Sequence, residues 1–319
     1  MKYFIIIFFF FIKTFSFAQY PPAAGLPGST AIFADSSIIV NWAKSCKVQR
    51  GFVDISSNSD SLVSNGFEND AIGKADNITV SLGDSGSAVL TFNPPLTNGN
   101  GFDFAVFENS FDGAFIELAF VEVSSDSINW FRFPSESVTQ VDSQVTTFGI
   151  LEPTKINNLA GKYKALFGTP FDLQELNGKP FLNIDSVTFV RIVDVIGSIS
   201  DNYATYDSDG NKINDPFPTP FYTSGFDLDA IGVINEKTQN IYNNKLNNVS
   251  IYPNPVKDFV NIYFKGFCNF EIIDIYGKKL VTGSFFNHIN IFTNELQPGV
   301  YVLKVYFENK YFTSNIIKY

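Results

Sequence analysis

Residues 120–133 read Phe-Val-Glu-Val-Ser-Ser-Asp-Ser-Ile-Asn-Trp-Phe-Arg-Phe, and this stretch decides the fold class. Polar residues interrupt the apolar ones at short intervals in its first part, 120–124, and again in its last part, 130–133. A run of Ser, Asp and Asn separates the two parts. Short apolar runs with a period of two are typical of half-buried β-strands, and the polar residues between them favour a turn. The stretch therefore predicts two strands joined by a polar turn.

The same pattern extends outward along the chain. Short β-rich runs bounded by Gly, Asn, Asp, Ser and Pro occur at 78–80, 88–92, 102–107, 115–123 and 186–193. Helical periodicity is scarce, and only residues 158–167 predict a short helix. Regularly spaced short strands are typical of sandwiches and barrels. The sequence therefore predicts an all-β chain whose residues 19–235 form a large jelly-roll-like β-sandwich.

Charge and rare residue types narrow the function. Residues 19–235 hold 26 acidic and 11 basic side chains, a net charge of −15, which excludes nucleic acid because phosphate binding needs clustered Lys and Arg. This acidity suits cation binding or solubility alone. The single histidine, His288, excludes a Ser-His-Asp triad and a multi-His zinc site in the large domain. Cys46 and Cys268 fall in different predicted domains, so no bridge between them is expected.

The first residues are typical of a secretory signal peptide at 1–18. Lys2 gives a positive start, 4–12 is a short apolar run, and small residues precede a cleavage site between Ala18 and Gln19. The run is too short to span a bilayer. No later apolar run is longer, so we expect no transmembrane segment in the mature chain.

A second module follows a polar, Asn-rich segment at 236–248 that is typical of a linker. Residues 249–319 hold about seven strand candidates with turn signals between them. They include 259–264, 270–276, 279–282, 289–292, 300–307 and 311–317. Short alternating strands in about 70 residues predict a small Ig-like β-sandwich.

Motifs in this second module carry a family resemblance. Tyr252-Pro253-Asn254-Pro255 comes first, 260–262 and 274–278 follow, a run at 296–305 contains Pro298-Gly299, and basic Lys318 lies near the end. This resembles the type A C-terminal sorting domain of the type IX secretion system of Bacteroidota. The resemblance implies recognition by the outer-membrane translocon and an extracellular or outer-membrane surface location. It also implies cleavage of the domain, with the cargo anchored on surface lipopolysaccharide or released.

Oxygen-bearing side chains in the large domain predict a calcium site. Asp207, Asp209, Asn211 and Asp215 take positions 1, 3, 5 and 9 of a loop, the spacing of the first calcium ligands in an EF-hand. Lys212 replaces the EF-hand glycine, so the loop is not an EF-hand. A plain Asp/Asn/Gly turn is the alternative. Asp227 and Asp229 are two apart in a predicted strand, which places both on one face and Phe226, Leu228 and Ala230 on the other. Two such carboxylates repel unless a cation intervenes.

The closing Gly-Phe-Asp-Leu-Asp-Ala-Ile-Gly at 225–232 and the strand-turn-Trp pattern resemble a family of Bacteroidota and exosortase-type surface proteins. Their domain is similar to galactose-binding-like (discoidin-type) jelly rolls, over roughly residues 25–235. The resemblance implies a calcium-supported sandwich that binds a ligand, often a glycan. Candidate ligand-binding residues are Glu108 and Asn109, at the polar end of a strand, and Trp130, for which core packing is the alternative.

Three functions fit these observations. A non-catalytic binding module for a glycan or other extracellular ligand, supported by Ca²⁺, is favoured because no nucleophile–base pair is visible. A glycan-active hydrolase needs paired carboxylates, for which Glu108, Glu122, Asp227 and Asp229 are candidates. A structural or adhesive surface role is compatible with the sequence but has no positive marker.

Overall fold

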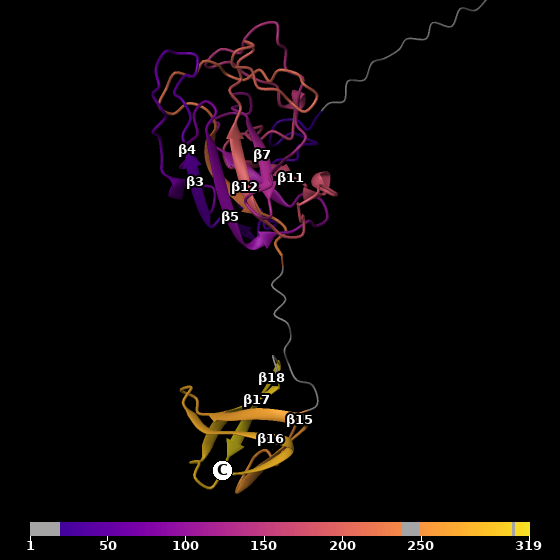
Figure 1. The fold of residues 1–319 in the computed structure, drawn as a ribbon. Helices are drawn as coiled ribbons and strands as arrows, with labels where there is room; N and C mark the ends of the chain where they lie inside the picture. Colours follow the sequence, from indigo (N-terminus) through magenta and orange to yellow (C-terminus); the bar gives the residue numbers. More distant parts are fainter. Residues whose placement is uncertain (1–19, 238–248, 308–309) are drawn as a thin grey trace, which may run out of the picture. The chain divides into compact units, whose positions relative to one another are not determined.

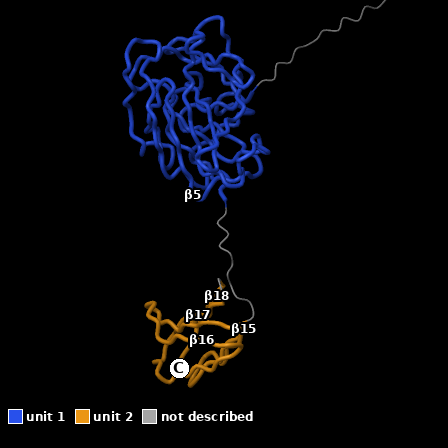
Figure 2. Tube along the Cα trace, viewed as in Figure 1, with its two compact units in different colours: residues 1–238 blue, residues 239–319 orange. Residues whose placement is uncertain are grey.

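The computed structural model describes residues 20–237, 249–307 and 310–319. The chain divides into two compact units, Met1–Thr238 and Gln239–Tyr319 (Figures 1 and 2). The predicted signal peptide with its Ala18–Gln19 cleavage site, and residues 238–248 of the predicted linker, lie outside the described residues. Within the described ranges no helix is long and apolar enough to cross a membrane.

The first unit is built on two main antiparallel sheets, labelled in part in Figure 1. One sheet has the order β1-β11-β6-β13-β2, with β4 also paired to β13. Its strands are β1 (Ile32–Phe33), β11 (Phe167–Phe171), β6 (Phe104–Glu108), β13 (Asp227–Val233), β2 (Asn41–Trp42) and β4 (Val80–Ser81). The residues of β13 are buried along its whole length, because it lies between β6 and the edge strands.

The second sheet has the order β3-β5-β12-β7-β8. Its strands are β3 (Ser45–Gln49), β5 (Ser87–Leu96), β12 (Val187–Asp194), β7 (Ala119–Ser124) and β8 (Phe131–Arg132). β7 and β8 are the strands predicted from residues 120–133, and they pair with Val123 opposite Phe131. Outside the sheets lie a small pair, β9 (Glu136–Ser137) with β10 (Ile156–Asn157), and three short 3₁₀ turns, Glu68–Ala71, Pro153–Lys155 and Leu173–Leu176.

Apolar side chains from both sheets share one core. Val106 and Leu228 come from the first sheet, and Leu90, Val121 and Val190 come from the second. Two sheets that bury one face each against a common core form a β-sandwich. The predicted all-β sandwich is confirmed.

The short helix predicted at 158–167 is wrong. Ala160 instead forms a backbone bridge with Ala119, and β11 begins at Phe167. Asn158, Gly161 and Leu166 all have positive φ, a backbone conformation that a right-handed helix does not contain. Pairing with β7 therefore overrides the local preference of these residues for a helix.

The second unit is one antiparallel sheet that encloses its own core. Its strands are β14 (Ser250–Tyr252), β15 (Phe259–Ile273), β16 (Lys279–Phe292), β17 (Gly299–Phe307) and β18 (Lys310–Lys318). Pairs of strands predicted separately are joined, because β15 and β16 run on through a break in register between Tyr263 and Phe267. The unit therefore has five strands within its described residues, fewer and longer than predicted.

Each unit holds one buried free cysteine, Cys46 in the first and Cys268 in the second. Both belong to the apolar core of their own unit. Burial raises the pKa of the Cys46 thiol to about 12, which keeps it in the unreactive thiol form.

Candidate functional site

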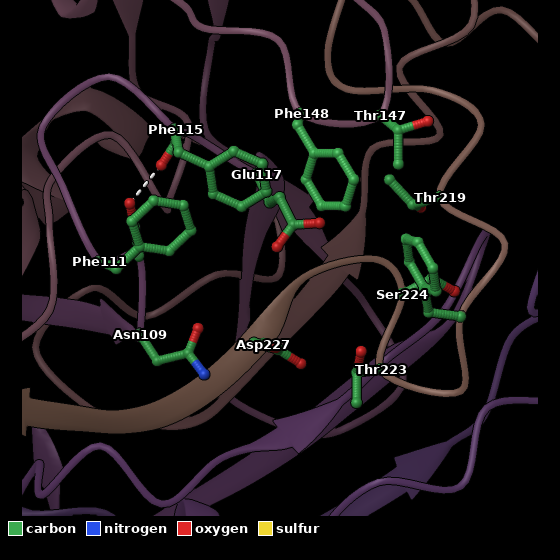
Figure 3. Close-up of a pocket in the computed structure, with 12 residues that line it drawn as sticks. Asn109, Phe111, Phe115, Glu117, Thr147, Phe148, Thr219, Thr223, Ser224 and Asp227 are labelled. Atoms are coloured by element: carbon green, nitrogen blue, oxygen red, sulfur yellow. Dashed lines mark hydrogen bonds between the residues drawn. The ribbon is translucent and has the colours of Figure 1, made fainter.

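A pocket of about 280 Å³ opens on the first unit (Figure 3). The loop between β6 and β7 and the loop before β13 supply most of its wall, and Thr147 and Phe148 come from the loop that follows β9. Its lining combines aromatic rings, hydroxyl groups and two carboxylates: Asn109, Ser110, Phe111, Phe115, Glu117, Thr147, Phe148, Thr219, Phe221, Thr223, Ser224 and Asp227. Its size is near the lower end of small-molecule sites, which span about 300–1,000 Å³.

Beside this pocket, each sheet has one carboxylate on its inner face, because side chains alternate between the two faces of a strand. In β6, Phe104 and Val106 face the shared core, so Glu108 continues the same face. In the second sheet, Ala119, Val121 and Val123 face the core, so Glu117 is on that face two residues earlier. The inner faces of both sheets therefore change from apolar side chains to carboxylates at this end of the sandwich.

Glu108 is the most enclosed of these carboxylates, with 1% of its surface exposed. Its Oε2 accepts a hydrogen bond from the Ser110 N–H at 2.8 Å. Its Oε1 is buried and has no hydrogen-bond partner in the protein. Burial, and then the negative charge of Asp227, raise the pKa of Glu108 well above its usual range. Burial and the neighbouring charge therefore favour the neutral form of Glu108.

Glu117 directs its carboxyl group into the pocket (Figure 3). Its side chain keeps some exposed surface because the pocket is open to solvent, yet protein atoms surround it. Burial, and then the charges of Asp227 and Glu108, raise its pKa well above the usual value. These three acids therefore act on one another electrostatically.

Gly161 fixes the backbone beneath Glu117. Its φ is +85°, and a Cβ at this position would lie 1.8 Å from the Glu117 carbonyl oxygen and 3.0 Å from the Phe226 ring. No side chain fits in that space. The close approach of the two backbones therefore requires glycine here.

Asp227 begins β13 and forms the other acidic side of the pocket. Its carboxylate accepts a hydrogen bond from the Ser81 hydroxyl. Burial raises the pKa of Asp227 to about 6, although hydrogen bonds from Ser81 and Asn109 and the positive charge of Arg50 oppose the shift.

Two more buried carboxylates lie within electrostatic reach and hold loops together. Asp194 accepts hydrogen bonds from the Phe226 N–H at 2.8 Å and the Ser85 N–H at 3.1 Å. Asp215 accepts one from the Leu118 N–H at 2.7 Å. Burial is the main cause that raises the pKa of both well above the usual value. Their hydrogen bonds give them a structural role in shaping the pocket.

Four phenylalanine rings form a chain along the pocket. The ring centroids of Phe111 and Phe115 are 4.9 Å apart and stacked, those of Phe115 and Phe148 are 6.5 Å apart, and those of Phe148 and Phe221 are 5.9 Å apart. Phe111 and Phe148 are 75% and 72% exposed. Large apolar rings that gather at the solvent side of a pocket are typical of a binding surface.

The predicted ligand-binding residues separate in the structure. Asn109 lines the pocket and Glu108 lies buried next to it. Trp130 is elsewhere, in the turn before β8, where its Nε1 donates to the Ser127 carbonyl at 3.2 Å. Its ring lies 4.3 Å from the Arg191 guanidinium and packs edge-on to Phe189. Trp130 therefore belongs neither to the pocket nor to the core between the sheets.

The predicted calcium ligands also separate. Asp207 accepts hydrogen bonds from the backbone N–H groups of Ser137, Asp209 and Asn211 at 2.8–3.0 Å. This is the arrangement of a capped Asp/Asn turn. Asp215 points instead to Leu118. Among the described residues, no three His, Cys, Asp or Glu side chains form a group that could hold a metal ion.

Asp227 and Asp229 do not share a regular strand face. The pairing of β13 with β6 shifts register between Leu228 and Ala230, so Asp229 is at a bulge. Leu228 faces the shared core, whereas Ala230 packs in a separate cluster on the other face. Asp229 accepts hydrogen bonds from the N–H groups of Asp76 and Asn77. The prediction that Phe226, Leu228 and Ala230 lie on one face is therefore wrong, because the bulge reverses the alternation.

Sequence reasoning missed Glu117 and the four rings. Glu117 is a single charge within the apolar run 115–123, and such an interruption is a signal of a functional or paired group. The rings come from three separate loops, and their meeting depends on the fold. Glu122, a candidate for hydrolysis, is bound by Arg132 at 2.9 Å and by Arg191, away from the pocket lining.

In the second unit, the residues singled out for sorting lie at strand boundaries. Tyr252 ends β14, and Pro253 and Pro255 follow it. The Asn254 side chain donates to the Asn315 carbonyl at 2.7 Å and accepts from the Ile317 N–H at 3.0 Å. Pro298 directly precedes Gly299, the first residue of β17. These contacts connect the start of the unit to its last strand.

Residues 250–319 match the family model described as secretion system C-terminal sorting domain. The chain is cargo of the type IX secretion system. This export route places it outside the cell or on the cell surface, as the sequence motifs predicted. The match does not extend to the first unit.

No curated protein matches the sequence of this chain. Solved structures with a distant likeness include Ruminococcus gnavus β-glucuronidase with uronic isofagomine (10% identity, TM-score 0.21, 94% of this chain and 45% of that one). Another is Bacteroides uniformis β-glucuronidase 3, with 10% identity and a TM-score of 0.21 over 87% of this chain and 34% of that one. A third is the BSP domain of a biofilm associated protein, with 10% identity and a TM-score of 0.20 over 89% of this chain and 53% of that one. The chain spans about half of these proteins or less. TM-scores this low carry no argument about its function.

Proposed function

We propose that the first unit is a non-catalytic binding module that type IX secretion delivers to bind an extracellular glycan. The observation that carries this proposal is the chain of four phenylalanine rings along a pocket whose lining also includes Glu117, Asn109 and Asp227. The proposal concerns the first unit alone, since the second unit serves export.

The chemistry of this lining suits a sugar. The C–H faces of a sugar ring are apolar and stack on aromatic rings, while its hydroxyl groups donate to carboxylates and exchange hydrogen bonds with amides and hydroxyls. Phe111 and Phe148 offer exposed faces, and Glu117 and Asp227 offer acceptors a short way inside. A galactose-binding-like character for this sandwich is part of the same proposal.

The calcium site at the Asp207 loop stays a prediction. Backbone N–H groups already engage the Asp207 carboxylate, so an ion there would have to replace them. Melting temperatures of the full chain with added calcium and with a chelator test the prediction. A rise with calcium that Asp207→Ala abolishes would support it, and equal melting temperatures would remove it. Anchoring on surface lipopolysaccharide also stays a prediction.

A glycan hydrolase is the second candidate, favoured by one observation. Glu117 and Asp227 both line the pocket, and the charge of Asp227 raises the pKa of Glu117. A protonated and an ionised carboxylate in one site are the groups that glycoside hydrolysis needs. Release of new reducing ends from a bound glycan, lost in Glu117→Gln, would replace the binding proposal with this one.

A glycan array probed with the full chain tests the proposal. We expect selective binding that Phe148→Ala weakens by about fivefold, since loss of one stacking ring removes on the order of 1 kcal/mol. Phe181→Ala is the matched control, because Phe181 is equally exposed at 77% and lies outside the pocket. Glycan binding that both substitutions leave intact would exclude this pocket as the binding site.

A further inference from the structure

We infer that this pocket selects ligands that carry a protonated amine, such as glycans with free amino-sugar units, over their neutral and acidic counterparts. The inference rests on the proposed function and names the class of glycan. It follows from the charge around the pocket, from one buried oxygen without a partner, and from the mixture of rings and carboxylates in the lining.

Negative groups gather around the pocket with little compensation. Seven carboxylates interact through their charges there: Asp84, Glu108, Glu117, Asp194, Asp215, Asp227 and Asp229. Arg50 is the cation whose charge reaches Asp227. Its guanidinium donates to the backbone carbonyls of Asn65, Ser81 and Gly66 at 2.5–2.7 Å. Arg50 therefore donates to backbone carbonyls, and its charge offsets only part of the effect of burial on Asp227.

The buried Glu108 oxygen shows where a donor is missing. Glu108 directly precedes the pocket-lining Asn109, and its carboxyl group interacts with the charges of Asp227 and Glu117, which line the pocket. Glu108 Oε1 is buried and has no donor. A buried acceptor without a partner costs about 1–3 kcal/mol. Glu108 itself does not line the pocket, so a positive charge bound beside Glu117 and Asp227 would act on this buried oxygen through its charge.

The geometry favours an organic cation over a bare metal ion. No three acidic side chains among the described residues converge closely enough to hold a metal. The pocket is larger than an ion needs, at about 280 Å³, and aromatic rings form a large part of its wall. Carboxylates that are spread around a ring-lined pocket suit a ligand with both an apolar body and a charged group.

A protonated amino group fits this lining in two ways. It has three N–H donors for the oxygens of Glu117 and Asp227, and charge-assisted hydrogen bonds of this kind are about twice as strong as neutral ones. It is also attracted to the faces of aromatic rings such as Phe115 and Phe148. A uronic acid or sulfate group at the same place would meet like charges and be repelled.

The test compares three oligosaccharides with the full chain by calorimetry at about pH 6, where such an amine carries its proton. They are oligomers of glucosamine, the same oligomers fully N-acetylated, and oligomers of galacturonic acid. Acetylation removes the charge and keeps the sugar ring, so it is the matched comparison. We expect the free amine to bind at least about tenfold more tightly than the acetylated form, and the acidic oligomer not to bind.

Two variants test whether the preference for the amine arises in this pocket. Glu117→Gln keeps the shape of the side chain and is expected to remove most of the preference for the amine. It should still fold, since burial disfavours the charge that it removes, and its melting temperature checks this. Asp142→Asn changes an exposed carboxylate outside the pocket and should keep the preference.

Equal or tighter binding of the acetylated oligomer would overturn the inference and leave glycan binding intact. A preference for the amine that survives Glu117→Gln would also overturn it, since the charge would then act elsewhere. Failure of all three oligomers to bind would overturn it too. In that case the glycan array decides separately whether the pocket binds any glycan, so the two failures are distinguishable.

Discussion

The two units treat their charged side chains in opposite ways. The first unit buries several carboxylates, and burial raises the pKa of Asp84, Asp194 and Asp215. In the second unit, Lys279 and Tyr306 lower the pKa of Glu271 by hydrogen bonding at the surface. Buried ionisable groups cost stability and are common at functional sites, whereas exposed ones cost little. The contrast indicates that the buried carboxylates place a cost on the stability of the first unit, whereas Glu271 places no such cost on the second.

The largest expected effect tests whether the second unit depends on its apolar core. Leu303 is fully buried in that core, so Leu303→Ala should cost about 2–5 kcal/mol and lower or abolish the melting transition of the second unit. Leu280→Ala removes the same atoms from a partly exposed site and should cost far less. Calorimetry of the full chain separates the transitions. A matching fall in the transition of the first unit would show that the units unfold together.

The next effect concerns pH and the first unit. Burial raises the pKa of Asp84 from 3.8 to about 7, so between these values the folded unit holds more protons than the unfolded chain. Stability is therefore greatest below the unfolded pKa and falls as pH rises through the folded pKa. At about 1.4 kcal/mol per pH unit, Asp84 alone predicts a loss of roughly 4 kcal/mol, or on the order of 10 °C in melting temperature, between about pH 4 and 8.

Asp227 and Asp229 act in the same direction, since burial raises the pKa of each to about 6. The measurement is a series of thermal melts of the full chain across this pH range. The transition of the second unit is the internal control, because none of the Asp and Glu side chains among its described residues is buried. A first unit that grows more stable as pH rises would contradict the contrast between the units.

A smaller effect on melting temperature tests whether Glu108 is needed in its charged form. Glu108→Gln keeps the shape and removes the charge, so we expect a higher melting temperature at about pH 8 and little change at about pH 5. Asp126→Asn is the opposite control. Hydrogen bonds from Asn129 and Ile128 lower the pKa of Asp126, so its neutral variant should be less stable. Destabilisation by Glu108→Gln at high pH would show that Glu108 is needed in its ionised form.

The smallest expected effect on stability compares exposed rings in the two units. Phe148 and Phe292 are 72% and 73% exposed, so replacing either by alanine should change stability by less than about 0.5 kcal/mol. Only Phe148→Ala is expected to weaken glycan binding, because Phe148 lines the pocket. Thermal melts and glycan titrations measure the two effects. A large loss of stability in Phe148→Ala would show that the chain of rings is part of the fold.

Alternation of side chains was enough to predict the sandwich. The run at 120–133 contains β7 and β8, because burial on one side of a strand repeats every two residues. The sorting motifs were equally local, since Tyr252 to Pro255 are adjacent in the chain. Features that depend only on residues adjacent in the chain can be predicted from a single sequence.

The pocket could not be predicted from the sequence, because it depends on contacts between residues that are far apart in the chain. Phe111, Phe148 and Phe221 come from loops far apart in the chain and meet only after the sheets pair. The bulge at Asp229 inserts one residue into β13, which a strict period of two does not predict. The Asp207 loop has calcium-like spacing, but backbone N–H groups bind its first carboxylate. Spacing alone does not distinguish an ion from an N–H group as the partner of an oxygen.

Gly161 has a consequence for how this protein can change over generations. Any amino-acid substitution at this position adds a Cβ that overlaps the Glu117 carbonyl oxygen, so we expect it to be lost through its effect on folding, whatever its effect on binding. The lining rings Phe111 and Phe148 are under no such constraint, because they are exposed. We therefore expect related chains to vary at the rings and to keep glycine beneath Glu117.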